Sequence, residues 1–287
     1  MLPRSIVVIL SLLLFVSSVS VFEAIFKVKP RIIDGEKAAA KEFPYIVSIR
    51  DAKVHKHFCG GALITQRNVL SAGHCLIGRR FQPDSIYIAL GVFNRLDDGV
   101  RKNVKRITIH SGFNKTFMHN DISIITTYTK IDYTARIQPI ALPIADVPEQ
   151  GNLNAVGAGW GRIINTLRKV LLPDQLQYHK TTTISWVECA FRLTRLSVEN
   201  PAAFKRVEMT FSENIVCTKN PIGRGSCNGD SGGPLVAKID GLDRIIGISS
   251  WGIGCGDGYP DVYTNVFAYS DWIEEQMIDN EMQNRRK

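Results

Sequence analysis

A single serine lies among small residues in the segment Cys227-Asn228-Gly229-Asp230-Ser231-Gly232-Gly233-Pro234. A serine hydroxyl is a weak nucleophile until a base takes its proton and a third group orients that base. The chain carries both partners upstream, in Ser71-Ala72-Gly73-His74-Cys75 and in Asn120-Asp121-Ile122. We therefore predict that Ser231 is a nucleophile, that His74 is its general base and that Asp121 orients the imidazole.

The residues beside the serine predict a site for developing negative charge. The backbone N–H groups of Gly229 and Ser231 are expected to form an oxyanion hole. Gly229 lacks a side chain, so its backbone can adopt an unusual conformation and approach a substrate closely. Asp230, between them, is expected to meet a buried positive charge, because a carboxylate is buried at low cost only when it is paired.

The first twenty residues are typical of a secretory signal peptide. Arg4 precedes a short apolar run, Ile6–Val16, and the small residues Ser18-Val19-Ser20 follow it. A signal anchor is the alternative, but the run is short for a bilayer. We expect residues 1–20 to be a signal peptide and the protein to be secreted, with no membrane association.

Residues 21–31 form a short segment that ends in Arg31 and is followed by Ile32-Ile33-Asp34-Gly35. One interpretation is a basic linker without a function. The other is an activation propeptide, whose cleavage after Arg31 frees the amino group of Ile32. That ammonium group could be buried only against a carboxylate, and Asp230 is the candidate.

The six cysteines lack a CxxC spacing, so zinc and thioredoxin-type sites are not expected. An even number of cysteines behind a signal peptide predicts three disulfides formed in an oxidising compartment. Their spacing alone leaves the pairing open. The cysteines are Cys59, Cys75, Cys189, Cys217, Cys227 and Cys255.

Length and charge allow a large core and exclude few functions. The chain has 287 residues and a formal net charge of +8, enough for one large domain or two small ones. The excess charge suits solubility or attraction to acidic substrates. The sequence has no basic stripe interleaved with aromatic residues, so no nucleic-acid partner is expected.

Short runs rich in Val, Ile and Tyr, separated by Gly, Asn, Asp and Pro, indicate an all-β chain of barrels or sandwiches. A proline-bearing stretch between Gln138 and Pro148 separates two series of runs, and a helix is expected near the C-terminus. The runs include Tyr45–Ile49, Ser85–Leu90, Arg106–Ile109, Leu153–Val156 and Arg244–Ile248.

From Ile32 to about Met277 the chain resembles the trypsin/chymotrypsin family of serine endopeptidases. Within that family it is similar to the arthropod members. Seven motifs occur in the family's order, which makes a chance match improbable. They are Ile32-Ile33-Asp34-Gly35, Cys59-Gly60-Gly61-Ala62-Leu63-Ile64, Ser71-Ala72-Gly73-His74-Cys75, Asn120-Asp121-Ile122, Gly159-Trp160-Gly161, Gly229-Asp230-Ser231-Gly232-Gly233-Pro234 and Ser250-Trp251-Gly252.

The resemblance implies two six-stranded antiparallel β-barrels with the active site in the cleft between them, followed by a C-terminal helix. The protease domain would be residues 32–287, with barrels at about 32–143 and 150–269 and the helix at about 270–283. The resemblance also implies the disulfide pairs Cys59–Cys75, Cys189–Cys217 and Cys227–Cys255.

The activity implied is that of a secreted serine endopeptidase made as a zymogen and acting through an acyl-enzyme. Its partners would be protein or peptide substrates, protein protease inhibitors and an activating protease, and we expect a monomer. No cofactor or metal is expected. An inactive homologue that serves as a binding module is the alternative from another class, although all three triad residues are present.

The primary substrate pocket departs from that of the trypsins, in which an aspartate stands six residues before the serine. Here that position is Gly225, while Asp261 stands where the family usually has glycine. A carboxylate moved across the pocket floor could still meet Arg or Lys, so we expect mixed primary specificity for Arg, Lys and large apolar residues. A chymotrypsin-like or elastase-like pocket is the alternative, with Asp261 pointing away.

Other residues are expected around that pocket, and two segments stand out. Gly252 and Gly254 would form open pocket walls, Ser250 would lie behind Asp121, and Trp251-Gly252 would offer backbone to an extended substrate.

The long span between Cys189 and Cys217 predicts an enlarged surface loop at about Phe191 to Met209, near the cleft. Asn114-Lys115-Thr116 is a glycosylation sequon.

Overall fold

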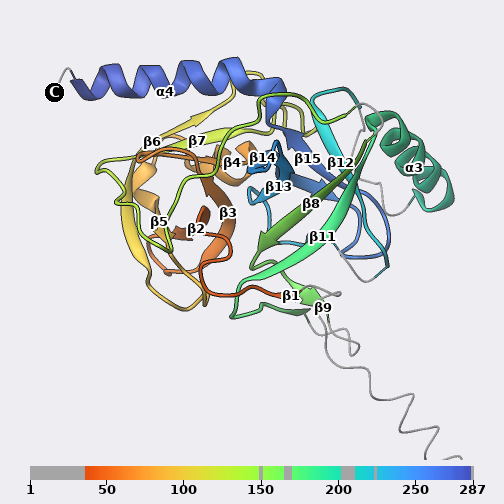
Figure 1. Ribbon diagram of the computed structural model, residues 1–287, viewed down its shortest axis with the longest axis horizontal. Coiled ribbons are helices and arrows are strands. Elements are labelled where there is room, and N and C mark those ends of the chain that lie inside the picture. The colour runs from red at the N-terminus through yellow and green to blue at the C-terminus, as the bar shows by residue number, and fades with distance from the viewer. Residues whose placement is uncertain (1–35, 149–150, 165–169, 202–210, 223–224, 286–287) are drawn as a thin grey trace, which may run out of the picture.

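The computed structural model describes residues 36–148, 151–164, 170–201, 211–222 and 225–285. The predicted signal peptide and propeptide, with Arg31 and Ile32, lie outside these ranges. Within them the chain forms two antiparallel barrels side by side, with one long helix along the first barrel and another at the outer end of the second (Figure 1). The sequence-based prediction of two six-stranded barrels is confirmed.

The first barrel closes in the strand order β2-β3-β4-β7-β6-β5. Its core is made of aliphatic side chains that alternate into the barrel, such as Val47, Ile49 and Ile88, all fully buried. Each such side chain contributes roughly 1.5–3 kcal/mol by leaving water. The strands are β2 (Ile46–Asp51), β3 (His57–Leu63), β4 (Asn68–Ser71), β5 (Ile86–Leu90), β6 (Val100–Ile109) and β7 (Ser123–Thr127).

The second barrel closes because β13 and β11 both pair with β8. The two-residue strand β1 (Glu36–Lys37) joins its outside by pairing with β11, and β9 (Ile163–Ile164) and β10 (Val170–Leu171) form a separate pair. The barrel strands are β8 (Gly151–Gly159), β11 (Gln177–Ile184), β12 (Ile215–Lys219), β13 (Pro234–Ile239), β14 (Leu242–Gly252) and β15 (Asp261–Asn265).

One apolar cluster joins the two barrels. It contains Leu70 and Ile122 of the first half, and Trp160 and Ile248 of the second. The C-terminal helix α4 (Ser270–Arg285) adds the fully buried Ile273 to this cluster and lies along the first barrel (Figure 1). The cluster therefore fixes how the barrels face each other, and with it the cleft between them.

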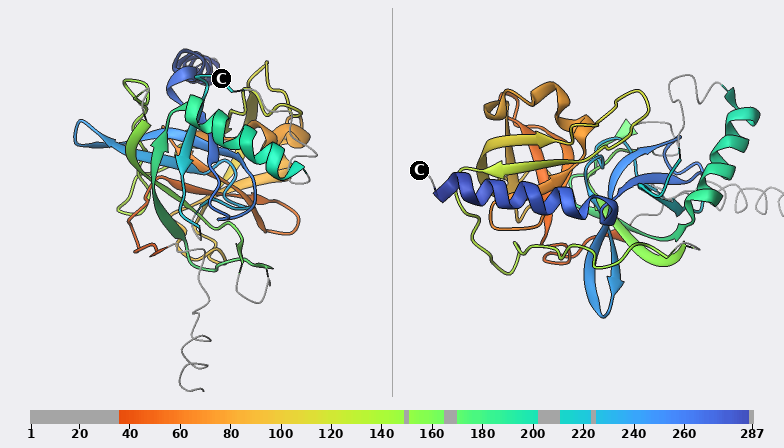
Figure 2. Two further views of the ribbon diagram at one scale, coloured as in Figure 1. Left: turned by 90° about the vertical axis from the view of Figure 1, so that its right-hand side faces the viewer. Right: turned by 90° about the horizontal axis from the view of Figure 1, so that it is seen from above.

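The prediction of a surface loop at Phe191 to Met209 is wrong for residues 191–199, because these residues belong to the helix α3 (Trp186–Glu199). Ser185 caps the helix by accepting the N–H of Glu188 at 3.0 Å. A buried face packs on the barrel through Cys189, Leu193 and Leu196. The helix lies at the end of the second barrel far from the first barrel (Figures 1 and 2), and so away from the cleft. Residues 202–210 lie outside the described ranges.

Three disulfides join the pairs that the resemblance implies: Cys59–Cys75, Cys189–Cys217 and Cys227–Cys255. The first ties β3 to the short helix α2 (Gly73–Leu76), and the second ties α3 to β12. The remaining helical turns are η1 (Ile77–Arg79), η2 (Pro83–Ser85) and η4 (Phe267–Tyr269). None of the helices in the described ranges is long and apolar enough to cross a membrane.

Candidate active site

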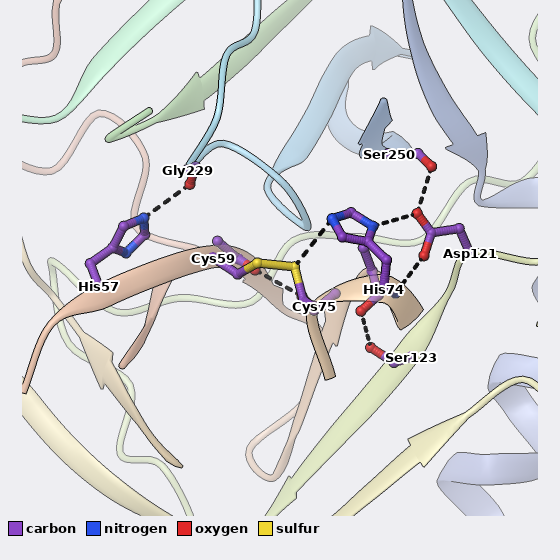
Figure 3. The surroundings of a disulfide bond; sticks show 11 residues. His57, Cys59, His74, Cys75, Asp121, Ser123, Gly229 and Ser250 are labelled. Atoms are coloured by element: carbon purple, nitrogen blue, oxygen red, sulfur yellow. Dashed lines mark hydrogen bonds and ion pairs between the residues drawn. A yellow bond between two sulfur atoms is a disulfide. The ribbon is translucent and has the colours of Figure 1, made fainter. Parts of the chain in front are cut away.

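His74 and Asp121 meet where β4 leads into α2 and the chain enters β7. His74 Nδ1 lies 2.7 Å from Asp121 Oδ2, and the backbone N–H of His74 donates to Oδ1 at 2.7 Å. Figure 3 shows the imidazole between this carboxylate and the Cys59–Cys75 disulfide. Since Nδ1–H donates to the carboxylate, the lone pair of the neutral ring is placed on Nε2.

Asp121 is fully buried and held from two further directions. Ser250 Oγ donates to its Oδ2 at 2.5 Å (Figure 3), and Thr264 Oγ1 donates to its backbone carbonyl at 2.8 Å. Ser250 therefore lies behind Asp121, at the position the sequence predicted. These bonds fix the carboxylate, and through it the plane and tautomer of the imidazole.

Ser231 lies on a tight loop whose backbone is held by three hydrogen bonds. Its carbonyl accepts the N–H of Gly60 at 2.8 Å, while the N–H groups of Gly232 and Gly233 donate to Ser249 and Asp230 at 2.8 Å each. Gly229 and Gly232 have φ of 108° and 78°, which L-residues with side chains rarely adopt. Ser231 and His74 line one cavity of about 380 Å³ in the cleft.

Asp230 points away from this cavity into the second barrel. Its Oδ1 accepts the N–H of Gly161 at 2.7 Å and its Oδ2 accepts the N–H of Cys227 at 2.9 Å. A Cβ on Gly159 or Gly161 would overlap the carboxylate. Burial raises the pKa of Asp230 to about 6. A small cavity of about 30 Å³ lies beside the carboxylate.

Asp261 points into the cleft cavity that contains Ser231. Its Oδ2 accepts the backbone N–H of Ser226 at 2.6 Å and an amide N–H of Asn220 at 2.8 Å. A Cβ on Gly225 would lie 2.9 Å from Oδ2, and one on Gly252 would lie 2.8 Å from Oδ1. The carboxylate therefore fills space that glycines at both positions leave open. Burial raises the pKa of Asp261 to about 7.

The family model named "Trypsin" matches residues 32–273, which is most of the chain. The chain belongs to the trypsin family. It is 33% identical to "Chymotrypsin-2" of Vespa crabro over 86% of this chain and 100% of that protein. It is 31% identical to "Trypsin-1" of Astacus astacus over 86% and 100%, and 33% identical to "Fibrinolytic enzyme, isozyme C" of Lumbricus rubellus over 84% and 98%.

Membership of the trypsin family makes this protein a serine endopeptidase whose substrates are proteins or peptides. The relatives carry the names of both a chymotrypsin and trypsins at similar identity. Overall similarity therefore does not decide primary specificity, and the residues of the pocket carry that argument.

The cleft of this trypsin-family protein widens beyond the predicted pocket residues. Gly252 and Gly254 line the Ser231 cavity as expected, together with Trp251. A neighbouring cavity of about 260 Å³ shares Trp251 and Ser250 and adds Phe117 and His119. Met118 lines both cavities, and no sequence motif singles it out.

His57 is a second residue that sequence reasoning missed, although it lies only two positions before Cys59. Its Nε2 lies 3.0 Å from the carbonyl oxygen of Gly229 (Figure 3), and its Nδ1 lies 2.9 Å from Ser48 Oγ. Burial lowers the pKa of His57 to about 4, so the ring is neutral and donates to Gly229 through Nε2. It thereby holds the Gly229–Asp230 peptide group, which directly follows the peptide whose N–H group was predicted to bind the oxyanion.

Two further expectations concern a glycan at Asn114 and the binding of metal ions. Asn114 is exposed, and its Oδ1 accepts the N–H of Thr116 at 2.9 Å within the sequon turn. Among the described residues, the only cluster with metal-ligand spacing is Cys59, His74 and Cys75. Its two sulfurs are bonded to each other, so it offers no thiolate to an ion.

Proposed function

We propose that this trypsin-family endopeptidase cleaves peptide bonds through an acyl-enzyme, with Ser231 as nucleophile. His74 takes the serine proton and then gives it to the leaving amine. Asp121 holds the tautomer and stabilises the imidazolium that forms. The observation that carries this is the pair of 2.7 Å contacts between Asp121 and His74, beside a cavity that both His74 and Ser231 line.

The backbone N–H groups of Gly229 and Ser231 would bind the oxyanion of the tetrahedral intermediate. Losing one such donor typically costs about 10²–10³ in rate. The positive φ of Gly229 supports this role, as does the hydrogen bond from the backbone N–H of Arg162 to the Asn228 carbonyl at 2.8 Å, because that carbonyl shares its peptide group with the Gly229 N–H. An extended substrate would add along the backbone of Trp251 and Gly252.

Activation would follow cleavage after Arg31 in a secreted zymogen. The free ammonium group of Ile32 would enter the cavity beside Asp230 and pair with its carboxylate. The support is a buried carboxylate with a raised pKa next to a cavity, since such a group is stabilised by a cationic partner. Asp230 in its buried position shapes the loop that carries both oxyanion donors.

A substitution at Gly161 tests this linkage. Gly161→Ala places a methyl group against the Asp230 carboxylate in its buried position, so the cleaved variant should remain nearly as inactive as the uncleaved chain. Circular dichroism should show an unchanged fold. Full activity of cleaved Gly161→Ala would contradict the role given to Asp230.

Primary specificity is proposed to be mixed, for Arg and Lys together with large apolar residues. The supporting observation is the position of Asp261, whose carboxylate lines the same cavity as Ser231 rather than pointing away from it. The glycine walls at Gly252 and Gly254 leave room for large side chains. A pocket selective for apolar residues is the competing proposal, favoured by the raised pKa of Asp261, because a neutral acid attracts no cation.

The deciding experiment is a cleavage profile of the cleaved protein on a peptide library. Activity that a serine-directed phosphonate removes, and that Ser231→Ala lacks while keeping its melting temperature, would support the triad. Cleavage after both Arg and Leu would support mixed specificity, and cleavage after Leu alone would refute it. An inactive binding module would show no cleavage and no labelling of Ser231.

A further inference from the structure

The two oxygens of the Asp261 carboxylate have different surroundings. Oδ2 faces the protein and accepts from the Ser226 backbone and from Asn220. Oδ1 lies on the side of Gly252, one of the residues that line the substrate cavity. A cationic substrate side chain would therefore meet Oδ1, while the bonds to Oδ2 determine where Oδ1 points and how readily the group ionises.

Asn220 follows directly after β12 and is 5% exposed. Its Nδ2 donates to Asp261 Oδ2 at 2.8 Å, and its Oδ1 accepts the hydroxyl of Thr181 at 2.8 Å. Thr181 lies on β11 and is also buried. The amide at the end of β12 is thus held between a hydroxyl on β11 and a carboxylate on β15, the two strands that flank β12.

The orientation of this amide follows from its partners. Turned by half a rotation, the Asn220 oxygen would face Asp261 Oδ2, and two acceptors would oppose each other at 2.8 Å. The observed orientation gives the amide oxygen a donor and the amide nitrogen an acceptor, as buried polar groups require. Because Thr181 can donate to the amide oxygen, it holds the amide nitrogen toward the carboxylate.

We propose that Asn220 is the positioning residue for primary specificity: it holds Asp261 in place and favours its charged form, so that the pocket accepts Arg and Lys. This inference rests on the mixed specificity proposed above. Asn220 does not touch the substrate. It would act only on substrates that need the Asp261 charge, and should leave cleavage after apolar residues unchanged.

Some neighbouring groups raise the pKa of Asp261 and others lower it. The titratable neighbours that influence it are Asp230, whose negative charge raises the pKa of Asp261, and Tyr263, whose own pKa is raised by burial and by Asp261. The hydrogen bonds from Ser226 and Asn220 lower the pKa of Asp261. Ser226 lowers this pKa through its backbone N–H and also through its side chain, which bonds to Tyr263 Oη at 2.8 Å. Asn220→Ala therefore removes one of the two side-chain contacts that lower the pKa of Asp261.

The test compares Asn220→Ala with a matched control, Asn265→Ala, in the cleaved protein. Asn265 is a buried asparagine on β15 that also donates to a carboxylate oxygen, Asp146 Oδ1, at 2.8 Å. The measured quantity is kcat/KM on two peptides that differ only in Arg or Leu at the cleaved position, from pH 6 to pH 9. Thr181→Val serves as a milder second variant, because it removes the closer of two hydroxyls that donate to the amide oxygen, the other being that of Thr218 at 3.5 Å.

In Asn220→Ala at pH 7 we expect a loss of about tenfold on the Arg peptide and a change of less than about twofold on the Leu peptide, since one hydrogen bond to a charged group is lost. The pH midpoint for Arg cleavage should move upward, so that the deficit shrinks at pH 9. Thr181→Val should change the Arg peptide in the same direction but less. Asn265→Ala should leave the Arg-to-Leu ratio as in the parent.

Equal losses on both peptides, or an unshifted midpoint, would overturn the role of Asn220. If Asn220→Ala does not fold, Thr181→Val decides by the same two criteria. Asp261→Asn distinguishes the role of Asn220 from the role of Asp261 itself. If it selectively removes Arg cleavage while Asn220→Ala does not, only the positioning role fails. If it leaves Arg cleavage intact, Asp261 is not the group that recognises Arg, and the positioning role of Asn220 fails with it.

Discussion

The preference between Arg and Leu should depend on pH through Asp261. Burial, opposed by the bonds from Ser226 and Asn220, raises the pKa of this carboxyl to about 7. Below that pH the group is mostly neutral and the pocket is polar but uncharged. Above it the carboxylate is charged and attracts a guanidinium. Raising the pH should therefore shift cleavage from Leu toward Arg.

The size of this shift follows from a single ionisation. With a pKa of about 7, about a tenth of the groups are charged at pH 6 and about nine-tenths at pH 8. If Arg cleavage needs the charge and Leu cleavage does not, the ratio of their kcat/KM values rises about tenfold over this interval. In free energy this is about 1.4 kcal/mol of pH-dependent discrimination.

The assay measures kcat/KM for matched Arg and Leu peptides between pH 5 and pH 9. Changes in the triad, or in the ion pair proposed for the Ile32 ammonium, would affect both substrates alike and would therefore cancel in the ratio. Asp261→Asn should give a low ratio that is flat with pH. A flat ratio in the parent protein, or one that falls as pH rises, would refute the role of the Asp261 charge.

Three further outcomes are expected. Ser250→Ala removes the 2.5 Å bond to Asp121 and should lower kcat/KM about tenfold on Arg and Leu peptides alike; a loss confined to one peptide in steady-state assays would contradict a role through the triad. Gly225→Asp brings a Cβ to 2.9 Å from the Asp261 carboxylate and should abolish cleavage of both peptides. The double variant Gly225→Asp with Asp261→Gly should recover cleavage of the Arg peptide. A fully active Gly225→Asp variant would show that the pocket holds two acids. Leu193→Ala on α3 should cost about 2–5 kcal/mol in urea unfolding without changing kcat/KM of the folded protein, and a large change in kcat/KM would connect α3 to the cleft.

The parts of this protein that the sequence predicted are those carried by local motifs. The glycines around Ser231, and the segments that carry His74 and Asp121, identify the family, and the family supplies the barrels and the disulfide pairs. Asp261 could also be found, because it replaces a glycine in a recognisable segment. Each of these is a statement about residue identity at a position that the motif already fixes.

What the sequence did not reveal depends on contacts between distant segments. Asn220 has no motif of its own and becomes significant only because β12 brings it to Asp261, 41 positions later. His57 likewise meets Gly229 across 172 positions. The helix α3 was read as a loop because its polar and basic composition hid the buried triplet Cys189, Leu193 and Leu196, whose spacing is helical.

The two-residue strand β1 determines how the new chain end would reach its partner. Glu36 and Lys37 pair with Tyr178 and Gln177, and these two residues also line the cavity beside Asp230. Only residues 32–35 lie between β1 and the amino group that cleavage would free on Ile32. A segment of this length spans at most about 14 Å. After cleavage, so short a connection would hold the amine near the cavity at an effective concentration of about millimolar or above. Activation should then be independent of protein concentration, resist competition by free dipeptides, and weaken when residues are inserted between Ile32 and Glu36.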